Sequence, residues 1–318
     1  MNLRNIFQKK WKTSFPRVAI YGQYKTGTTA CFLRIKNSLR PAPRELFEQP
    51  VYTPHPDDHK KPVLAKVIIP PDPNLYALKV PGANPYDNLM QKAEAGIASF
   101  RSFDKHILLL RDPRDRIVSG TLFIPQERQQ VYENDEVLNQ LLDILHRKEQ
   151  NPRSVSMLEI LCTILQDSPA SVWQRITNLI ERHHAFIFAF EQSLGKHVKW
   201  KYEDMIAGKA EHVEEYLGFK FSGGINSEEK YGHVKRAGMS GDWRHWFTEE
   251  DVDFFKPLMA TYLERYRYNR SWDLQPNPFI KPEHASGYVF RTVQRKRAPA
   301  IGNHDLPFRN FSSDFHDQ

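Results

Sequence analysis

The sequence has few of the features that mark secreted, membrane-spanning or metal-binding proteins. Its 318 residues include only two cysteines, Cys31 and Cys162, which cannot form a disulfide framework. No stretch approaches the roughly 20 apolar residues of a membrane span, and no apolar run of signal-peptide length precedes Arg17. His183 and His184 are adjacent and point in different directions, which makes them a poor pair of metal ligands. We expect a cytoplasmic protein without a metal cofactor.

The composition is that of a globular protein with a basic surface. Hydrophobic residues make up 40% of the chain, and 20 Phe, 13 Tyr and 6 Trp are enough to fill a core. The length allows one large domain or two of ordinary size. The formal net charge of +7 fits an anionic ligand or substrate, but a solvated basic surface would explain it equally well.

The clearest local pattern lies between Arg17 and Leu39. An apolar run at 18–21 predicts a strand, a loop with Gly22 and Gly27 follows, and apolar residues at helical spacing over 30–39 predict a helix. Such a loop suits an anion, because the backbone N–H groups and the dipole of the helix both favour negative charge. Lys25 adds a cation suited to phosphate or sulfate oxygens.

This loop differs from the common nucleotide-binding pattern, G-x-x-x-x-G-K-S/T. Gly22 and Gly27 have the required spacing, but Thr28 occupies the lysine position and the lysine lies inside the loop, at Lys25. The pattern alone is weak, since an ordinary glycine turn before a helix has the same sequence. We favour a site for a phosphate-like anion.

Further elements can be predicted along the chain. Strands are expected at 63–69, 75–80, 107–110, 185–190 and 198–202, and helices at 86–102, within 131–183, at 211–217 and at 249–268. Residues 40–62 are rich in proline, which argues against a regular helix or a central strand there. We expect a basic lead at 1–16, one domain at 17–270 and an irregular tail at 271–318.

A second polar motif follows the strongest strand signal. Arg111 stands at the end of the buried run 107–110, Asp112 can cap the next helix, and Pro113 suits its first turn. Ligands bind at strand ends of open α/β sheets. The sequence therefore predicts that Arg111 lies at a ligand-binding edge, although a capping or salt-bridge arginine would also fit.

Four segments resemble, in order, the sulfotransferases that use 3′-phosphoadenosine 5′-phosphosulfate (PAPS), with cytosolic and bacterial members closest. The family motifs read approximately Y-P-K-S-G-T-T, R-N-P-x-D-x-x-x-S, Y-E-D and R-K-G-x-x-G-D-W-K. The matching segments of this chain are 24–29, 111–119, 202–204 and 236–244. The resemblance implies an α/β fold related to the P-loop NTPases, with a parallel sheet flanked by helices.

The resemblance also implies which residues bind PAPS. The loop would hold the 5′-phosphosulfate, with Lys25 stabilising the charge that grows on the leaving phosphate. The 3′-phosphate would lie on arginines, whose planar fork makes paired bonds to phosphate oxygens. Tyr202 would lie against the adenine, although it could instead belong to the core. The implied PAPS-binding residues are Tyr24, Lys25, Thr26, Gly27, Thr28, Thr29, Arg111, Ser119, Tyr202, Arg236 and Gly238.

The chain departs from the family in three places. Ala237 replaces a lysine of the last motif, and the K-x-H-x-P histidine is absent after Lys79, which we expect to remain as a second cation. Some carbohydrate sulfotransferases use a glutamate downstream of the loop lysine, and Glu48 has a comparable position, with apolar neighbours that could raise its pKa. We predict Glu48 as the catalytic base, with His55 second. The family's dimerisation element is incomplete here, so the oligomeric state stays open.

Three hypotheses follow. The first is a PAPS-dependent sulfotransferase acting on a small-molecule or carbohydrate acceptor, with no nucleic acid partner. The second is a non-catalytic relative that binds PAPS or its product, adenosine 3′,5′-bisphosphate (PAP). The third, a P-loop kinase, is disfavoured because Thr28 replaces the lysine and Arg111 stands where an acidic Mg²⁺ ligand is needed.

Overall fold

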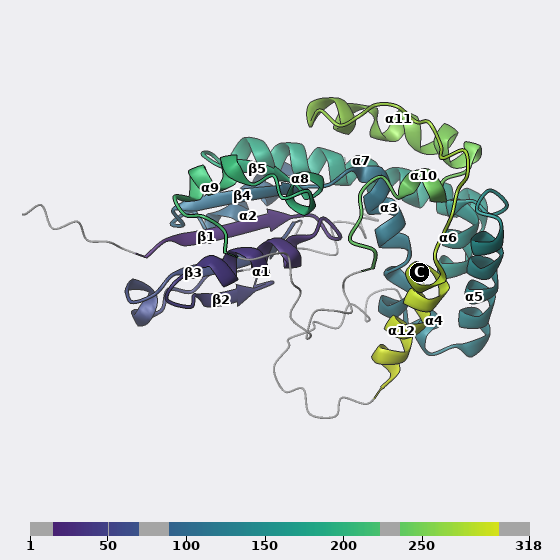
Figure 1. Cartoon of the computed structure of the whole chain (residues 1–318), viewed down its shortest axis with the longest axis horizontal. Coiled ribbons are helices and arrows are strands. Elements are labelled where there is room, and N and C mark those ends of the chain that lie inside the picture. Colours follow the sequence, from purple (N-terminus) through teal and green to yellow (C-terminus); the bar gives the residue numbers. More distant parts are fainter. Residues whose placement is uncertain (1–14, 50, 70–88, 223–235, 299–318) are drawn as a thin grey trace, which may run out of the picture.

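A five-stranded parallel sheet organises the protein. The computed structural model describes residues 15–49, 51–69, 89–222 and 236–298 (Figure 1). The strand order is β2-β3-β1-β4-β5. The strands are β1 (Arg17–Gly22), β2 (Arg44–Phe47), β3 (Val63–Ile68), β4 (Lys105–Leu110) and β5 (Val198–Lys201). All neighbouring pairs are parallel, so the α/β class expected from the sequence is confirmed.

The central strands are buried on both faces, which explains their continuous apolar runs. In β1 and β4 every residue after the first is buried, as expected for parallel strands covered by helices on both sides. β2 lies at one edge of the sheet, where the prolines around it can be tolerated. The predicted strands at 63–69, 107–110 and 198–202 are confirmed; the one at 75–80 lies outside the described residues.

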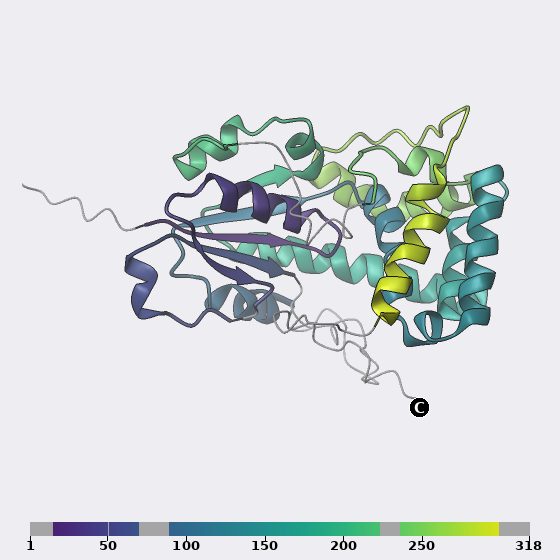
Figure 2. The ribbon, with the colours of Figure 1, turned by 60° about the horizontal axis from the view of Figure 1, so that its bottom comes forward.

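Helices cover the two faces of the sheet (Figure 2). On one face, α1 (Thr28–Ser38), α8 (Tyr202–Ile206) and α9 (Glu211–Leu217) share a core with Val18 and Ile20. On the other face, α2 (Leu89–Ala98) and α7 (Pro169–Ser193) pack on Ala19 and Tyr21. Alternate residues of β1 therefore anchor opposite layers, as the two-residue period of a strand requires.

A helical layer lies beyond the carboxyl ends of the strands, at the right in Figure 1, and has its own apolar core. Its helices are α3 (Pro113–Thr121), α4 (Gln129–Tyr132), α5 (Asp135–Gln150), α6 (Met157–Leu165), α10 (Trp243–Trp246), α11 (Glu249–Arg265) and α12 (Ser286–Arg297), with short 3₁₀ turns η3 (Ile124–Glu127) and η5 (Pro282–His284). A further 3₁₀ turn, η1 (Pro56–His59), precedes β3. Because α3 follows β4 directly, this layer borders the edge of the sheet where the glycine loop lies.

Two predictions are wrong. Residues 185–190 form part of α7 rather than a strand, because Phe186, Ile187 and Phe190 continue the helical spacing of Ile176 and Ile180. The tail expected to be irregular contains α12. Four of its buried residues recur one helical turn apart; they are Tyr288, Val289, Thr292 and Val293. Of these, Tyr288, Val289 and Val293 pack into the core of the helical layer.

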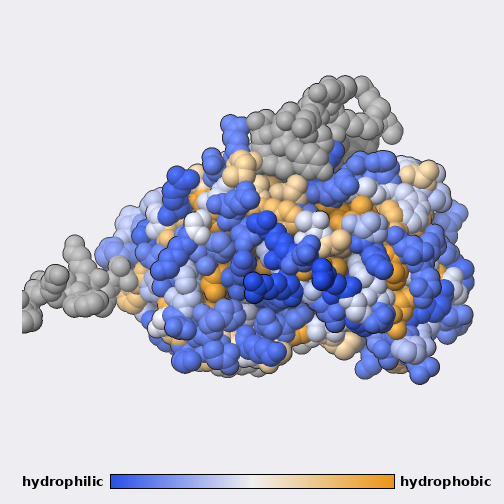
Figure 3. Space-filling model, turned by 90° about the horizontal axis from the view of Figure 1, so that it is seen from above, coloured by the Kyte–Doolittle hydropathy of each residue, from blue (hydrophilic) through white to orange (hydrophobic). Residues whose placement is uncertain are grey.

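The surface is mainly polar. Figure 3 shows hydrophilic residues predominating on the face seen from above, with hydrophobic residues in smaller areas between them. Scattered apolar residues of this kind are ordinary on protein surfaces. Over the described ranges, no helix is both long and apolar enough to cross a membrane.

Candidate functional site

The glycine loop forms a tight turn between β1 and α1. Thr26 Oγ1 donates a hydrogen bond to the carbonyl oxygen of Gln23 at 2.6 Å, and Thr26 N donates to the same oxygen at 3.2 Å. A Cβ atom on Gly22 would lie 2.5 Å from Thr28 Cγ2. The loop can therefore close only with glycine at position 22.

Gly27 ends the loop and begins α1. Its φ of +88° lies in the left-handed region, and a Cβ atom there would come within 2.4 Å of the Tyr202 ring. Among the described residues, no side chain caps the N-terminus of α1. The first N–H groups of α1 therefore depend on partners other than a capping side chain, as in helix-terminal anion sites.

Lys25 lies in the loop between these glycines. Its Nζ is 3.9 Å from the centroid of the Phe123 ring, and its backbone φ is 64°. The pKa of Lys25 is lowered well below its usual value, first because burial disfavours the charge and then because Arg111, Arg236 and Lys66 add positive potential. A cation in these surroundings would be stabilised by a nearby anion.

Arg111 extends the site at the carboxyl end of β4. Its side chain is buried, Nη1 donates to the carbonyl oxygen of Lys25 at 2.9 Å, and its guanidinium lies 4.6 Å from the centroid of the Tyr202 ring. Tyr202 is therefore held between Gly27 and Arg111. Tyr202 also belongs to the core beneath α1, which matches the structural alternative considered for it.

Lys66 is a cation of the site that was not predicted from the sequence. It lies on β3 opposite Ile20 of β1, and only 2% of it is exposed. Its Nζ donates to Thr29 Oγ1 at 2.8 Å and to Glu48 Oε1 at 2.5 Å. Burial lowers the pKa of Lys66, and Glu48 opposes this shift. The available signal was a single charge within the apolar run of the predicted strand.

Glu48 lies near the loop, but its surroundings differ from the prediction. Its side chain is 45% exposed and ion-paired with Lys66, so the apolar enclosure expected around it is wrong. The reason is local, because Glu48 follows an edge strand with φ of 57° and points to the surface. His55, the second candidate base, caps η1 and accepts a hydrogen bond from Asp57 N.

The segment around 236–243 is attached to α3 through Asp115. Gly241 N and Trp243 N donate to the Asp115 carboxylate at 2.6 and 3.0 Å. Burial raises the pKa of Asp115 to about 6, and the charge of Arg111 opposes this. Arg236 forms an ion pair with Asp242, and Gly238 has φ of 67°. The motif segment is thus fixed beside the strand end that carries Arg111.

The other predicted residues occupy varied positions. Ser119 is buried in the second turn of α3. Tyr24 is 43% exposed, and its ring packs edge-on against Phe123. Lys79, the expected second cation, lies outside the described residues.

Several buried polar atoms at this edge have no hydrogen-bond partner among the residues that the structure describes. Arg111 Nε, Arg236 Nε and the Tyr288 hydroxyl make no hydrogen bond within the described part of the chain. Tyr288 lies on α12, and its hydroxyl contributes to the raised pKa of Tyr24. Burial raises the pKa of Tyr288, and the charge of Arg236 opposes this. Buried donors without partners are costly, and their grouping is typical of a site for a polar ligand. The sequence prediction missed Tyr288 because its segment was expected to be irregular.

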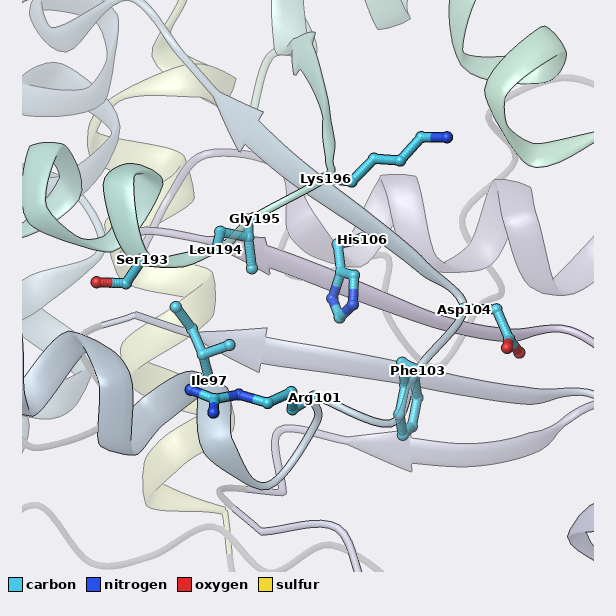
Figure 4. Close-up of a pocket in the computed structure, with 9 residues that line it drawn as sticks. All are labelled: Ile97, Arg101, Phe103, Asp104, His106, Ser193, Leu194, Gly195 and Lys196. Atoms are coloured by element: carbon cyan, nitrogen blue, oxygen red, sulfur yellow. The ribbon is translucent and has the colours of Figure 1, made fainter.

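A separate pocket lies at the opposite edge of the sheet (Figure 4). It encloses about 350 Å³ near the amino-terminal end of β4. Its polar groups do not converge: Lys196 points away from the pocket, and Asp104 accepts a hydrogen bond from Arg17 N at 2.9 Å. We therefore place the candidate site at the carboxyl edge. The described residues contain no group of three or more His, Cys, Asp or Glu side chains arranged to hold a metal.

Of the comparisons with known proteins, the one with solved structures gives a match. No protein-family model and no curated protein matches the chain. Among solved structures, the chain is similar to the mouse sulfotransferase SULT7A1 in a crystal structure complexed with PAP. The match has 13% sequence identity, covers 80% of this chain and 88% of that chain, and has a TM-score of 0.39. We draw no conclusion about function from a similarity of this size.

Proposed function

We propose that this chain is a PAPS-dependent sulfotransferase that moves a sulfuryl group to a hydroxyl or amine of its acceptor. The observation that carries the proposal is the group of three cations around the N-terminus of α1. Lys25 lies in the loop, Lys66 donates to Thr29 of α1, and Arg111 donates to the loop backbone. A dianionic donor would meet both positive charge and free N–H groups there.

The buried nitrogen atoms that have no hydrogen-bond partner among the described residues would suit the 3′-phosphate, the second anionic end of PAPS. Arg111 Nε and Arg236 Nε are donors that a 3′-phosphate could accept from, and Ser119 follows on the adjacent helix α3. Arg236 is already ion-paired with Asp242, so it would share its guanidinium between this carboxylate and the phosphate. Arg111 is therefore assigned the larger share of 3′-phosphate binding.

The chemistry asks mainly for positioning and charge stabilisation. When sulfuryl transfer occurs, negative charge grows on the 5′-phosphate, as in phosphoryl transfer. Lys25 and the N–H groups of the loop would stabilise that charge more strongly in the transition state than before it. Lys66 would add a fixed positive charge beside Thr29, where a sulfuryl oxygen would lie close to α1.

The second candidate is a non-catalytic protein that binds PAPS or PAP. The absence of the family's histidine pattern in the sequence favours it. It predicts nucleotide binding without transfer. A P-loop kinase remains disfavoured by Thr28 and Arg111, for the reasons given by the sequence.

Calorimetry tests the binding part of the proposal. PAP should bind the wild type more tightly than adenosine 5′-monophosphate, which lacks the 3′-phosphate. Arg111→Ala should weaken PAP binding by roughly 10- to 100-fold, the value of one or two charge-assisted hydrogen bonds. It should change binding of the monophosphate much less. Equal losses for the two nucleotides would mean that Arg111 is structural.

Radiolabelled PAPS then separates the two candidate functions. Transfer of label to any member of a panel of phenols, alcohols, amines and sugars supports the enzyme. Binding of PAP without transfer to any acceptor, including water, supports the non-catalytic protein.

A further inference from the structure

A glutamate of the helical layer, Glu127, lies in the turn that follows a contact between that layer and the loop. Lys25 Nζ is 3.9 Å from the centroid of the Phe123 ring, Phe123 directly precedes η3, and Glu127 is the last residue of that turn. The Glu127 carboxylate favours the charged form of Lys25 and the neutral form of Tyr24. Glu127 thus belongs to the turn that meets the loop through Phe123, whereas Arg111 meets the loop from the end of β4.

The Glu127 carboxylate is available for chemistry. It makes no hydrogen bond or ion pair with any residue that the structure describes, and it remains partly accessible. Glu48, by contrast, already accepts a 2.5 Å hydrogen bond from Lys66 Nζ. Of these two carboxylates, Glu127 is the one that is not ion-paired with a lysine or arginine in the described part of the chain.

We propose that Glu127 is the general base of the transfer, an inference that rests on the proposed sulfotransferase function. The acceptor hydroxyl gives its proton to the Glu127 carboxylate, and its oxygen forms a bond to sulfur. The bond between sulfur and the bridging oxygen breaks, and the electron pair stays on the 5′-phosphate of PAP. Lys25 stabilises this leaving phosphate, and in-line transfer requires the base and the leaving group to lie on opposite sides of the sulfur.

The electrostatic surroundings suit a base. Burial raises the pKa of Glu127, Lys296 of α12 and Lys25 lower it, and Glu48 raises it. Among the described residues, Tyr132 of α4 and Tyr24 of the loop are further titratable groups that interact with Glu127. A carboxylate with a raised pKa is a stronger base, and the ideal base has a pKa near the operating pH. The rate should therefore rise with pH as Glu127 loses its proton.

The test compares acceptors that do and do not need a base. Phenol stays protonated in neutral and mildly alkaline buffer, whereas p-nitrophenol is partly ionised at neutral pH and largely ionised in mildly alkaline buffer. Glu127→Gln should slow transfer of labelled sulfate to phenol by about 10²–10⁴-fold, the usual contribution of a general base. The same variant should slow transfer to p-nitrophenol much less. It should also remove the acidic limb of the pH–rate profile, that is, the fall in rate that protonation of Glu127 causes at acidic pH in the wild type. If the wild type transfers sulfate to neither phenol nor p-nitrophenol, the slow rate of PAPS hydrolysis is measured instead. Water is then the acceptor, and it must also lose a proton.

Two further variants complete the design. The exposed Glu94→Gln on α2 should leave the acidic limb in place, and Glu127→Asp should retain part of the rate. PAP binding by calorimetry should match the wild type in all three variants, which shows that the site is folded. Equal losses with both phenols, or a wild-type rate in Glu127→Gln, would overturn Glu127 as the base and leave the sulfotransferase function standing. A wild type that binds PAP but transfers sulfate to nothing, water included, would overturn the proposed function and the base together.

Discussion

Arg111 and Arg114 are three residues apart, and both are buried, yet they belong to regions of opposite character. Arg114, in the helical layer, donates to the Asp112 carboxylate through Nε and Nη2, and to the carbonyl oxygens of Ser271 and Asn269. Arg111, at the edge of the sheet, donates once, to the Lys25 carbonyl oxygen, and its Nε has no partner among the described residues.

Lys148 and Lys25 differ in their hydrogen-bond partners in the same way as Arg114 and Arg111. Lys148 of α5 is completely buried, and its Nζ donates to the carbonyl oxygens of Pro152 and Val155 at 2.8 and 2.5 Å. Lys25 has cations as its principal charged neighbours. Buried charges with satisfied hydrogen bonds hold a fold together, whereas buried cations placed near one another are favourable only when an anion joins them. The comparison thus separates the hydrogen-bonded cations Arg114 and Lys148 from Arg111 and Lys25, which the proposed function assigns to donor binding.

The largest expected effect is on stability, from Arg114→Met. Removing this guanidinium takes away the charged partner of the Asp112 carboxylate, which keeps its hydrogen bond from the backbone N–H of residue 114, and the donors of two carbonyl oxygens. Breaking a buried ion pair typically costs about 3–5 kcal/mol. Arg111→Met removes one hydrogen bond from a charged donor, worth about 1.5–3 kcal/mol. Urea unfolding of both variants measures the difference, with the exposed Arg101→Met as control. Similar losses for Arg111 and Arg114 would refute the comparison.

The next effect is on catalysis, from Lys25→Ala. Losing one donor to the developing charge typically costs about 10²–10³ in rate, whereas the free energy of unfolding should hardly change because Lys25 Nζ contacts a ring rather than a carboxylate. The exposed Lys256→Ala on α11 is the matched control for both measurements. Near-normal turnover of Lys25→Ala would show that the loop cation is not part of the reaction.

The sequence predicted those parts of the molecule that depend on neighbouring residues. The loop between β1 and α1 follows from two glycines and a strand–helix junction, and the Asp112 cap with Pro113 follows from local chemistry. The buried strands follow from continuous apolar runs. The run at 185–190 failed because a short apolar segment fits a strand and a buried helix equally well.

The rest of the site depends on contacts between distant segments. The sequence contains Lys66 and Glu48 separately, but only the pairing of β3 with β1 and β2 brings Lys66 to both Thr29 and Glu48. Glu127 and Tyr288 come from η3 and α12, which pack together in the helical layer, and both interact electrostatically with Tyr24 of the loop. No periodicity or spacing in a single sequence encodes such proximity. The predicted roles of the loop residues, Arg111 and Tyr202 stay predictions until a nucleotide is bound.

The smallest expected effect is a pH dependence of stability that separates the two lysines. Burial lowers the pKa of Lys148 from its ordinary 10.5 to about 8, with Asp251 and Glu159 opposing the shift and Arg153 adding to it. Below pH 8 both the folded and the unfolded chain hold the proton, so Lys148 contributes no slope. Above it the folded protein releases the proton first, and the free energy of unfolding rises with pH.

Urea unfolding between pH 7 and 10 of the wild type and of Lys148→Met isolates this contribution, which cannot exceed about 1.4 kcal/mol per pH unit for one proton. Lys25 should contribute a slope of the same sign, since its pKa is also lowered, and Lys25→Met isolates it. Saturating PAP should abolish the slope from Lys25, because a bound anion favours the charged form, and should leave the slope from Lys148 unchanged. If PAP alters both slopes equally, or neither, the division between ligand-binding and structural cations is wrong.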